Sequence, residues 1–575
     1  MHPLSGQLAA FFAGPVTKQL AHLNAVDIAV IAIYFGIVIF IGFYLKGSAN
    51  TSEEFFMAGR EMTAWIAGLS FVSANLGSLE LMGWAGSAYQ YGILATHWYW
   101  IGAIPAMLFL GIIMMPFYYI SKVNSVPGYL HLRFGDGARA LSAVSFAFMT
   151  VLMSGINMYS MALVMKVVLG WNLNFSIWVS SITVALYVAL GGLRSAIYNE
   201  VLQFILIWLG ALLVPILGLI EAGGWTKLKA QILVNVGNTQ YVHMWSGLGH
   251  FNDNPMGVHW TGIVFGLGLV ISFGYWTTDF LVVQRVLSAH NLRAARMAPI
   301  IGAGFKMAVP FIVILPGLLA LSVLPFHLVG ESQAVLTGQH SYNEVLPLML
   351  VRYCGPGLLG LGVTALIAGF MSGMAGNVSA FSTVWTYDIY GAFINKKATD
   401  KHYVAMGRWC TFVGVLISVG TAYLVQHAAS IMDYVQSLFS FFIAPLFGTV
   451  ILGMLWKRAT KAGGFWGLLA GTSTAIGLWA WVHNDPSALR YVALSPDAKA
   501  MAEDLYRALW SWLVCVIVTV VVSYMTPARP TSELVGLVYG ASPLPEEHDD
   551  HWYQKPIVWA GAIAALFVVV NIIFW

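Results

Sequence analysis

Charged residues are scarce in this sequence. Only 9% of its 575 residues are Asp, Glu, Lys or Arg, whereas 59% are hydrophobic, and the mean hydropathy is +0.77. A soluble domain carries roughly 25% charged residues, so the composition excludes an ordinary soluble protein. The chain is therefore predicted to be a polytopic membrane protein.

Cysteine and nucleotide-binding motifs are also scarce or missing. The three cysteines, Cys354, Cys410 and Cys515, lie within or beside apolar segments, which argues against a disulfide framework and gives no metal-ligand spacing. No Gly-Lys dipeptide occurs, so there is no Walker A loop for ATP phosphates. Gly-x-Ser-x-Gly and His-Glu-x-x-His motifs are absent as well. These absences argue against a primary pump and a membrane hydrolase, and we expect no enzymatic activity and no bound cofactor.

Long apolar segments are what the sequence does contain. Fourteen windows of at least about 18 mostly apolar residues are each long enough to cross a bilayer as a helix. The first is read as a retained helix, because no basic segment precedes it and no small-residue cleavage site follows. The predicted spans are residues 26–46, 63–87, 98–120, 140–168, 173–191, 199–222, 259–283, 299–325, 356–388, 408–426, 433–455, 463–483, 508–526 and 557–575.

Lys and Arg are distributed unevenly between the loops. Eighteen of the twenty-seven follow odd-numbered spans, and short cytoplasmic loops are the ones that collect basic residues. We therefore predict an integral protein of the plasma (inner) membrane with both termini on the extracytoplasmic side. The twenty-two Trp residues, including Trp98, Trp100 and Trp575, are interpreted as interfacial belts.

Two spans carry residues that interrupt a helix near mid-depth. In span 63–87 the interruption is at residues 75–78, and in span 259–283 Gly266, Gly268 and Gly274 precede Asp279. Unwound backbone is tolerated in a bilayer where it lines a cavity. Because these are the second and seventh spans, they fit two inverted five-helix repeats formed by spans two to six and seven to eleven. The alternative is that the glycines serve only close helix packing.

Lys306 lies inside the apolar span 299–325. A charge near the bilayer midplane costs roughly 3 kcal/mol even on the lenient insertion scale, so it is expected to face a cavity or a counter-ion. Snorkelling along its own helix is the alternative. Glu80 is expected to face the same cavity, within reach of Lys306. Further polar residues inside apolar spans are candidate ligands for a polyol, although each also suits an interhelical hydrogen bond: Asn75, Ser272, Tyr275, Ser372, Asn377 and Gln436.

Seven stretches, in order and spacing, resemble the sodium/solute symporter family and its sodium/glucose cotransporter branch. They are TSEEFFMAGREMTAWIAGLSFVSANLGS, VPGYLHLRFG, GGLRSAIYNEVLQ, FGYWTTDFLVVQRVLSAHN, GFKMAVPF, FSTVWTYDIY and DYVQSLFSFFIAPLFG, the last continued by LWKRATKAGGFWG. The resemblance implies an all-α, leucine-transporter-type fold of about fourteen transmembrane helices, with two inverted five-helix repeats and flanking helices. The expected regions are an N-terminal segment with the first flanking helix, a transporter core built from two repeats, and C-terminal flanking helices, at 1–62, 63–455 (repeats about 63–222 and 259–455) and 456–575.

The resemblance also implies a substrate site. It places sugar contacts on Asn75, Ser272, Lys306 and Gln436, an inner gate on Tyr275, and Trp276 beside that gate. Glu80 departs from the family, which has His or Gln there, and a family glutamate aligns with Trp100 or Tyr99. The expected substrate-binding set is Asn75, Glu80, Ser272, Tyr275, Trp276, Lys306 and Gln436.

A sodium site follows from the same resemblance. Its ligands map to the backbone carbonyls of Ser73, Leu76 and Gly369 and to the hydroxyl of Ser372. Gly373 stands where the family has a second hydroxyl, so a water or Asn377 is expected to substitute. A second sodium site of some relatives maps to Ala375 and Gly376 and is therefore not expected, although Glu200 keeps a carboxylate near the inner side.

The implied activity is secondary active transport. We expect Na⁺-coupled symport of a sugar or similar small polar solute by alternating access, with the lipid bilayer as surroundings and no nucleic-acid partner. The missing hydroxyl at Gly373 and the titratable Glu80 leave open a proton-coupled or uncoupled carrier. A membrane sensor built on the same fold is a further alternative. The solute, the stoichiometry and the oligomeric state do not follow from the sequence.

Overall fold

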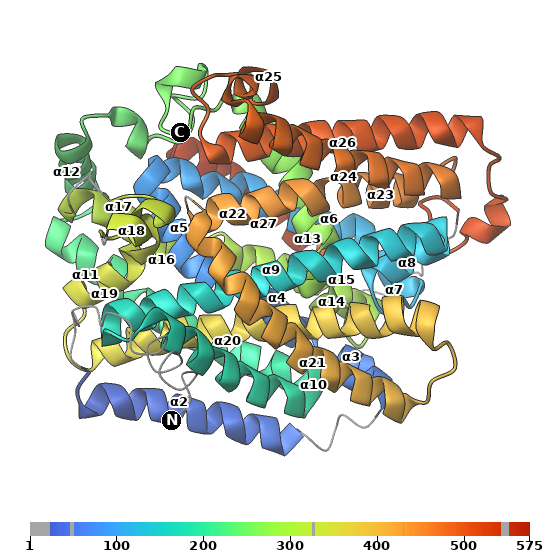
Figure 1. The fold of residues 1–575 in the computed structure, drawn as a ribbon, viewed down its shortest axis with the longest axis horizontal. Helices are drawn as coiled ribbons and strands as arrows, with labels where there is room; N and C mark the ends of the chain where they lie inside the picture. Colours follow the sequence, from blue (N-terminus) through green and yellow to red (C-terminus); the bar gives the residue numbers. More distant parts are fainter. Residues whose placement is uncertain (1–22, 46–50, 325–327, 338, 429, 542–550) are drawn as a thin grey trace, which may run out of the picture.

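The computed structural model describes residues 23–45, 51–324, 328–337, 339–428, 430–541 and 551–575. These residues form helices and their connections, with two isolated β-bridges and no longer strand among them. The long helices run side by side across the view, with α2 (Ala25–Leu45) at one edge and α26 (Ala500–Met525) near the opposite edge (Figure 1). A bilayer offers no water to backbone N–H and C=O groups, so its spanning segments pair these groups internally as helices. The predicted all-α class is confirmed.

Thirteen spans are present within the described residues when each bent helix pair is counted as one span, and ten of the thirteen are unbroken. The fifth predicted span, 173–191, is the part of α10 (Leu173–Ala211) that precedes Gly192, where a non-helical backbone (φ 58°, ψ −163°) kinks the helix and separates this part from the sixth span. The other thirteen predicted spans each match one of these. The ten unbroken spans are Ala25–Leu45, Trp98–Ile120, Asp136–Leu169, Gly192–Ala222, Leu358–Ile394, Asp400–His427, Ile431–Leu455, Lys461–Asn484, Ala500–Met525 and Pro556–Ile573.

Three further spans are bent. The first bends by 56° between α4 (Ala64–Asn75) and α5 (Ser78–Tyr91). The second bends by 49° at Asp279, between α13 (Phe273–Thr278) and α14 (Phe280–Leu287), so its break follows the predicted glycines instead of coinciding with them. The third, which the sequence analysis did not predict, bends by 46° between α15 and the pair α16 and α17. Their bounds are Leu292–Lys306, Pro310–Val313 and Leu315–Val323.

Several helices contain π-helical segments, which are often found at functional sites. These segments are η4 (Trp98–Ala103), η5 (Leu110–Met114), η8 (Gly262–Ser272), η10 (Trp385–Ile394) and η12 (Phe439–Ile443). The remaining α-helices are α3 (Ser52–Met57), α6 (Ile104–Phe109), α7 (Met115–Ile120), α8 (Val126–Phe134), α9 (Asp136–Leu169), α11 (Leu213–Ala222), α12 (Trp225–Val236), α18 (Glu331–Thr337), α19 (Val345–Tyr353), α20 (Leu358–Val384), α21 (Asp400–Ala422), α22 (Ile431–Leu438), α23 (Ala444–Leu455), α24 (Lys461–Asn484), α25 (Leu489–Val492) and α27 (Pro556–Ile573).

Close helix packing holds the broken spans in the centre. α4 packs against α15, α10 and α20, while α20 also packs against α9. Between α10 and α20 the approach depends on Gly210, because a Cβ atom there would lie 2.6 Å from the backbone oxygen of Leu361. Small residues permit such backbone contact, and van der Waals packing is the main attraction between helices in lipid. The core helices therefore pack closely around the bends.

The segment between the third bent span and α20 is anchored by buried carboxylates. Glu331 accepts hydrogen bonds from Ser341 (2.6 Å), Asn343 (2.7 Å) and Tyr159 of α9. Asn343 in turn accepts from the backbone N–H of Ile431 at the start of α22 (3.1 Å). This segment therefore ties α9 to the N-terminus of α22, the helix that carries Gln436.

A second carboxylate in this segment, Glu344, makes the folded state sensitive to pH. Lys166 Nζ lies 2.9 Å from one of its oxygens, and His340 Nδ1 hydrogen-bonds the other. The hydrogen bond to Glu344 raises the pKa of His340 above its usual value, against the opposing effect of partial burial. His340 therefore stabilises the fold fully below its unfolded pKa of about 6.5, and the contribution is lost as pH rises through the folded pKa.

We expect His340→Ala to lower the melting temperature of the detergent-purified protein more at about pH 5.5 than at about pH 9. Thermal unfolding at both pH values measures the difference. In a Glu344→Gln background, the loss of melting temperature caused by His340→Ala should no longer depend on pH. An equal loss at both pH values in the wild-type background would contradict the ion-pair interpretation.

Candidate functional site

The helix breaks surround one buried cavity in the centre of the molecule. It has a volume of about 60 Å³, which is room for a few water molecules. All the residues predicted to bind substrate line it: Asn75, Glu80, Ser272, Tyr275, Trp276, Lys306 and Gln436. The structure thus brings this predicted set together, and the role of each residue in binding stays a prediction.

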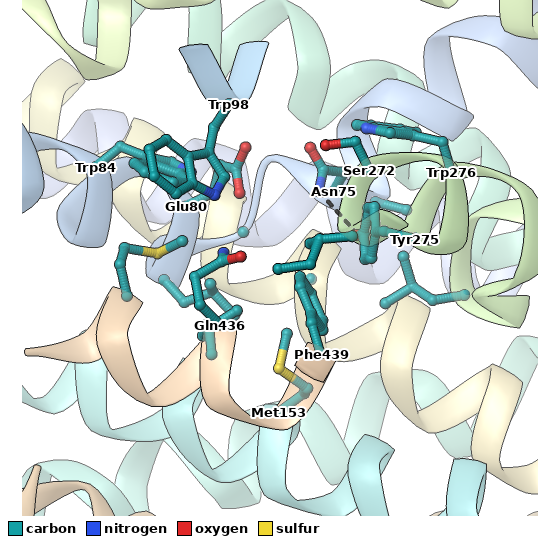
Figure 2. A pocket seen from close by; sticks show the side chains of 18 of the residues that line it. Asn75, Glu80, Trp84, Trp98, Met153, Ser272, Tyr275, Trp276, Gln436 and Phe439 are labelled. Carbon is teal, nitrogen blue, oxygen red and sulfur yellow. Dashed lines mark hydrogen bonds between the residues drawn. The ribbon is translucent and has the colours of Figure 1, made fainter. Parts of the chain in front are cut away.

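The cavity has two polar sides (Figure 2). Glu80 lies on one side with Trp84 and Trp98, and Asn75 and Ser272 lie on the other side with Tyr275 and Trp276. The amide of Gln436 projects from α22 between these two sides, above Phe439. A solute in the cavity is therefore offered carboxylate, amide and hydroxyl groups together with flat aromatic faces.

Lys306 is held by a counter-ion and an amide. Its side chain is 1% exposed, and its Nζ donates to Asn75 Oδ1 and to Glu80 Oε1, the latter at 3.1 Å. The ammonium also lies 4.9 Å from the ring centroid of Tyr99 and 5.2 Å from that of Trp276, within cation–π range. The predicted pairing with Glu80 is confirmed, and the snorkelling alternative is wrong.

Both charges lie at helix ends of the matching sign. Lys306 is the last residue of α15, and Glu80 lies in the first turn of α5. A helix C-terminus carries partial negative charge and an N-terminus partial positive charge, so each break stabilises the charge beside it. The interruptions in the helices therefore contribute to the electrostatics of the cavity.

Asn75 connects the three bent spans. It is the last residue of α4, its Nδ2 donates to Tyr275 Oη at 2.8 Å, and its Oδ1 accepts from Lys306. Tyr99 adds a hydrogen bond of 2.7 Å to the same oxygen of Glu80 that Lys306 contacts. Among the described residues no hydrogen bond reaches the second oxygen of Glu80, Oε2, which leaves it available to a solute.

The inferred sodium ligands also lie together, between α4 and α20. Ser372 Oγ donates to the backbone oxygen of Ser73 at 2.9 Å, and the two serine hydroxyls are 3.0 Å apart. A Cβ atom at Gly369 would lie 3.0 Å from the backbone oxygen of Leu76, which places that carbonyl against α20. These groups supply neutral oxygens, the ligand type that hard cations prefer.

The carboxylate of Glu200 is occupied by a buried ion pair. Arg285 contacts its two oxygens at 2.6 and 3.2 Å, and both side chains are fully buried. Ser70, one turn before Ser73 on α4, hydrogen-bonds the same carboxylate. Because breaking a buried pair is costly, this contact ties α4 to α10 and α14 beside the inferred sodium ligands.

Sequence reasoning missed several residues that line the cavity. Trp98 is 8% exposed and lines the cavity, and Trp100 is buried and donates to the backbone oxygen of Met307 at 3.0 Å. Their assignment to an interfacial belt is wrong. The presence of a tryptophan does not by itself distinguish an interfacial belt from a pocket. Five other residues that line the cavity carry no motif or charge that would have identified them from the sequence: Trp84, Met153, Asn157, Met432 and Phe439.

A helical membrane protein whose broken spans enclose a polar cavity has the architecture of a secondary transporter. The model of the sodium:solute symporter family matches residues 55–471. The chain therefore belongs to the sodium:solute symporter family, and its activity is Na⁺-coupled symport.

Full-length relatives agree with this assignment. Sodium/glucose cotransporter 4 of Danio rerio is 30% identical over 93% of this chain and 84% of its own length. Sodium/glucose cotransporter 1 of Oryctolagus cuniculus is 29% identical over 96% of this chain and 86% of its own. A substrate-bound, outward-open Na⁺-coupled sialic acid symporter is 18% identical and superposes with a TM-score of 0.70 over 88% of this chain and 99% of its own. The predicted leucine-transporter-type fold is confirmed.

Glu80→Gln tests the central ion pair, because it removes the charge and keeps the shape of the side chain. Leaving one partner of a buried pair uncompensated typically costs about 3–5 kcal/mol, whereas replacing both partners is often nearly neutral. We expect Glu80→Gln to lower the melting temperature more than the double variant Glu80→Gln/Lys306→Met. Thermal unfolding in detergent measures both, and additive losses would show that the two residues are not coupled.

Proposed function

We propose that the solute is a neutral sugar, bound in the central cavity by Glu80, Lys306, Asn75 and Gln436. The observation that supports this most strongly is the ion pair between Glu80 and Lys306, at 3.1 Å. The pair gives the cavity opposite charges that cancel. A solute with a net charge would leave an uncompensated charge in a low-dielectric site, which is unfavourable.

Hydrogen-bonding capacity in the cavity suits hydroxyl groups. Glu80 Oε2 is available as an acceptor, and within the described part of the chain Gln436 Oε1 has no hydrogen-bond partner. Burying an acceptor without a partner costs about 1–3 kcal/mol, and a hydroxyl donor from a solute would recover it. The faces of Trp276 and Tyr275 add apolar surface for the C–H faces of a sugar ring.

The names of relatives favour the same class of solute. The two similar full-length proteins are named sodium/glucose cotransporters, while the structural neighbour is a sialic acid symporter. Sialic acid carries a carboxylate, and the carboxylate of Glu80 would repel it. Like-charge contact is an effective means of rejecting a competing solute. Glu80 is thus proposed to select against acidic sugars.

Sodium is proposed to bind between α4 and α20, at the carbonyls of Ser73, Leu76 and Gly369 and the hydroxyl of Ser372. The cavity of about 60 Å³ is too small for a hexose. Solute entry therefore requires the lining carried by α5 and α22 to separate, as expected for gating of one helix bundle against the other. Sodium at the α4 break would stabilise one arrangement of that break, which links ion binding to solute binding.

Uptake into proteoliposomes tests the solute and the coupling ion together. The panel contains a labelled neutral hexose, the corresponding hexosamine and the corresponding uronic acid, with sodium and pH gradients imposed separately. We expect sodium-driven uptake of the neutral hexose and little uptake of the acid. Uptake of the uronic acid in preference to the hexose would reject the neutral-sugar proposal, and uptake driven by the pH gradient alone would favour the proton-coupled alternative.

Gln436→Ala should weaken binding of the neutral hexose about tenfold or more, because it removes a hydrogen bond worth about 1–3 kcal/mol. The dissociation constant is measured in detergent at saturating sodium. Ser437→Ala, one residue along α22, is the control, because the Ser437 hydroxyl contacts Asp504 and Arg507 of α26. Unchanged affinity in Gln436→Ala would remove Gln436 from the site.

A further inference from the structure

Asn157 is a buried amide in the middle of α9 that the proposed function leaves without a role. It is 1% exposed and lines the solute cavity. Its Oδ1 lies against two glycines: a Cβ atom at Gly77 would be 2.6 Å away, and one at Gly373 would be 3.0 Å away. The amide oxygen therefore occupies the space beside the α4 break and α20 that a side chain at either glycine would need.

We propose that Asn157 Oδ1 is a sodium ligand that completes the oxygen cluster between α4 and α20. The proposal rests on the sodium site proposed above and adds an element to it, since α9 supplies none of the other ligands. Gly373 follows Ser372 directly and contributes no side chain, so α20 itself presents a single hydroxyl here. The oxygen of Asn157 fills the space next to that position.

The chemistry of the amide fits this role. Hard cations take neutral carbonyl and amide oxygens as well as carboxylates, usually six or more of them. Three backbone carbonyls and the hydroxyl of Ser372 supply four, so a further protein oxygen improves the site. The Asn157 oxygen has spare capacity, because its contacts from Leu79 N–H (3.4 Å) and Ser78 Oγ (3.5 Å) are at the long limit of hydrogen bonding.

The position of Asn157 also links the ion to the solute. The same side chain lines the cavity that holds Glu80 and Gln436 and lies beside the break that carries Leu76. A group that contacts both sites gives them a shared interaction, which is what a coupling free energy requires. Asn157 is thus a positioning residue for the solute side of the cavity and a ligand on the sodium side.

The test uses sodium alone, so it does not depend on the identity of the solute. The melting temperature of the purified full-length protein is measured as choline chloride is replaced by NaCl at constant ionic strength. We expect Asn157→Ala to raise the half-saturating sodium concentration about tenfold or more, and Asn157→Asp to lower it, because a carboxylate binds sodium more strongly than an amide. Ser160→Ala, on the same helix, is the control, since its hydroxyl donates to its own helix at Ile156 (2.8 Å).

A compensating pair sharpens the test. In Asn157→Ala/Gly373→Ser the introduced hydroxyl gains the space that Oδ1 occupied, so the sodium response should return to within about threefold of wild type. The single variant Gly373→Ser should be stabilised poorly by sodium, because its Cβ would lie 3.0 Å from Asn157 Oδ1 and crowd the amide. If Asn157→Ala does not fold, the half-saturating sodium concentrations of Asn157→Asp and of the double variant test the proposal in its place.

The outcomes separate the two proposals. A wild-type protein that sodium does not stabilise would overturn the sodium site of the proposed function itself. A wild-type protein that responds to sodium, with Asn157→Ala and Asn157→Asp both at the wild-type half-saturation, would overturn the role of Asn157 alone. An effect in Ser160→Ala equal to that in Asn157→Ala would also overturn it, because the loss would then come from disturbed packing of α9.

Discussion

One positive charge in the interior of a membrane protein organises the centre of this molecule. Lys306 is 1% exposed, and without partners its ammonium would lose its hydration without gaining any compensating interaction. Glu80 supplies the counter-charge, Asn75 supplies an amide oxygen, and two aromatic rings lie within cation–π distance. These partners come from α5, α4 and the helices beside them, so the charge fixes how three bent spans meet. The central cavity is the space that this arrangement encloses.

The helix breaks make this arrangement possible in lipid. Each break leaves backbone groups without helical partners, which is tolerated where the backbone lines a cavity or is buried in protein. The break after Asn75 also exposes the carbonyls of the inferred sodium site, and the end of α15 presents its negative pole to Lys306. The break after Asn75 thus places the inferred sodium ligands of α4 close to the ion pair of Glu80 and Lys306.

The sequence predicted most of this because its signals are local and strong. Thirteen spans follow from apolar length, and Asn75–Ser78 marked the first break by its polar and glycine residues. The bend between Lys306 and Pro310 was missed because Lys306 was interpreted only as a buried charge, although Pro310 marks the start of α16. The kink of α10 depends on the non-helical backbone of Gly192, which hydropathy does not reveal. Trp98 and Asn157 were missed because their roles depend on which helices pack together, and neither residue type specifies that by itself.

Cancellation of charge in the cavity bears on how transport is powered. If the solute is the neutral sugar proposed above, it adds no charge to the paired Glu80 and Lys306, and the loaded cavity would carry only the charge of the proposed sodium ion. Moving one such charge through the membrane potential yields about 2.3 kcal/mol per 100 mV, which corresponds to roughly fiftyfold accumulation of the solute. A solute anion would cancel this charge, and the potential would then no longer drive uptake. A neutral cavity beside a cation site is therefore the arrangement that lets the membrane potential act fully on a neutral solute.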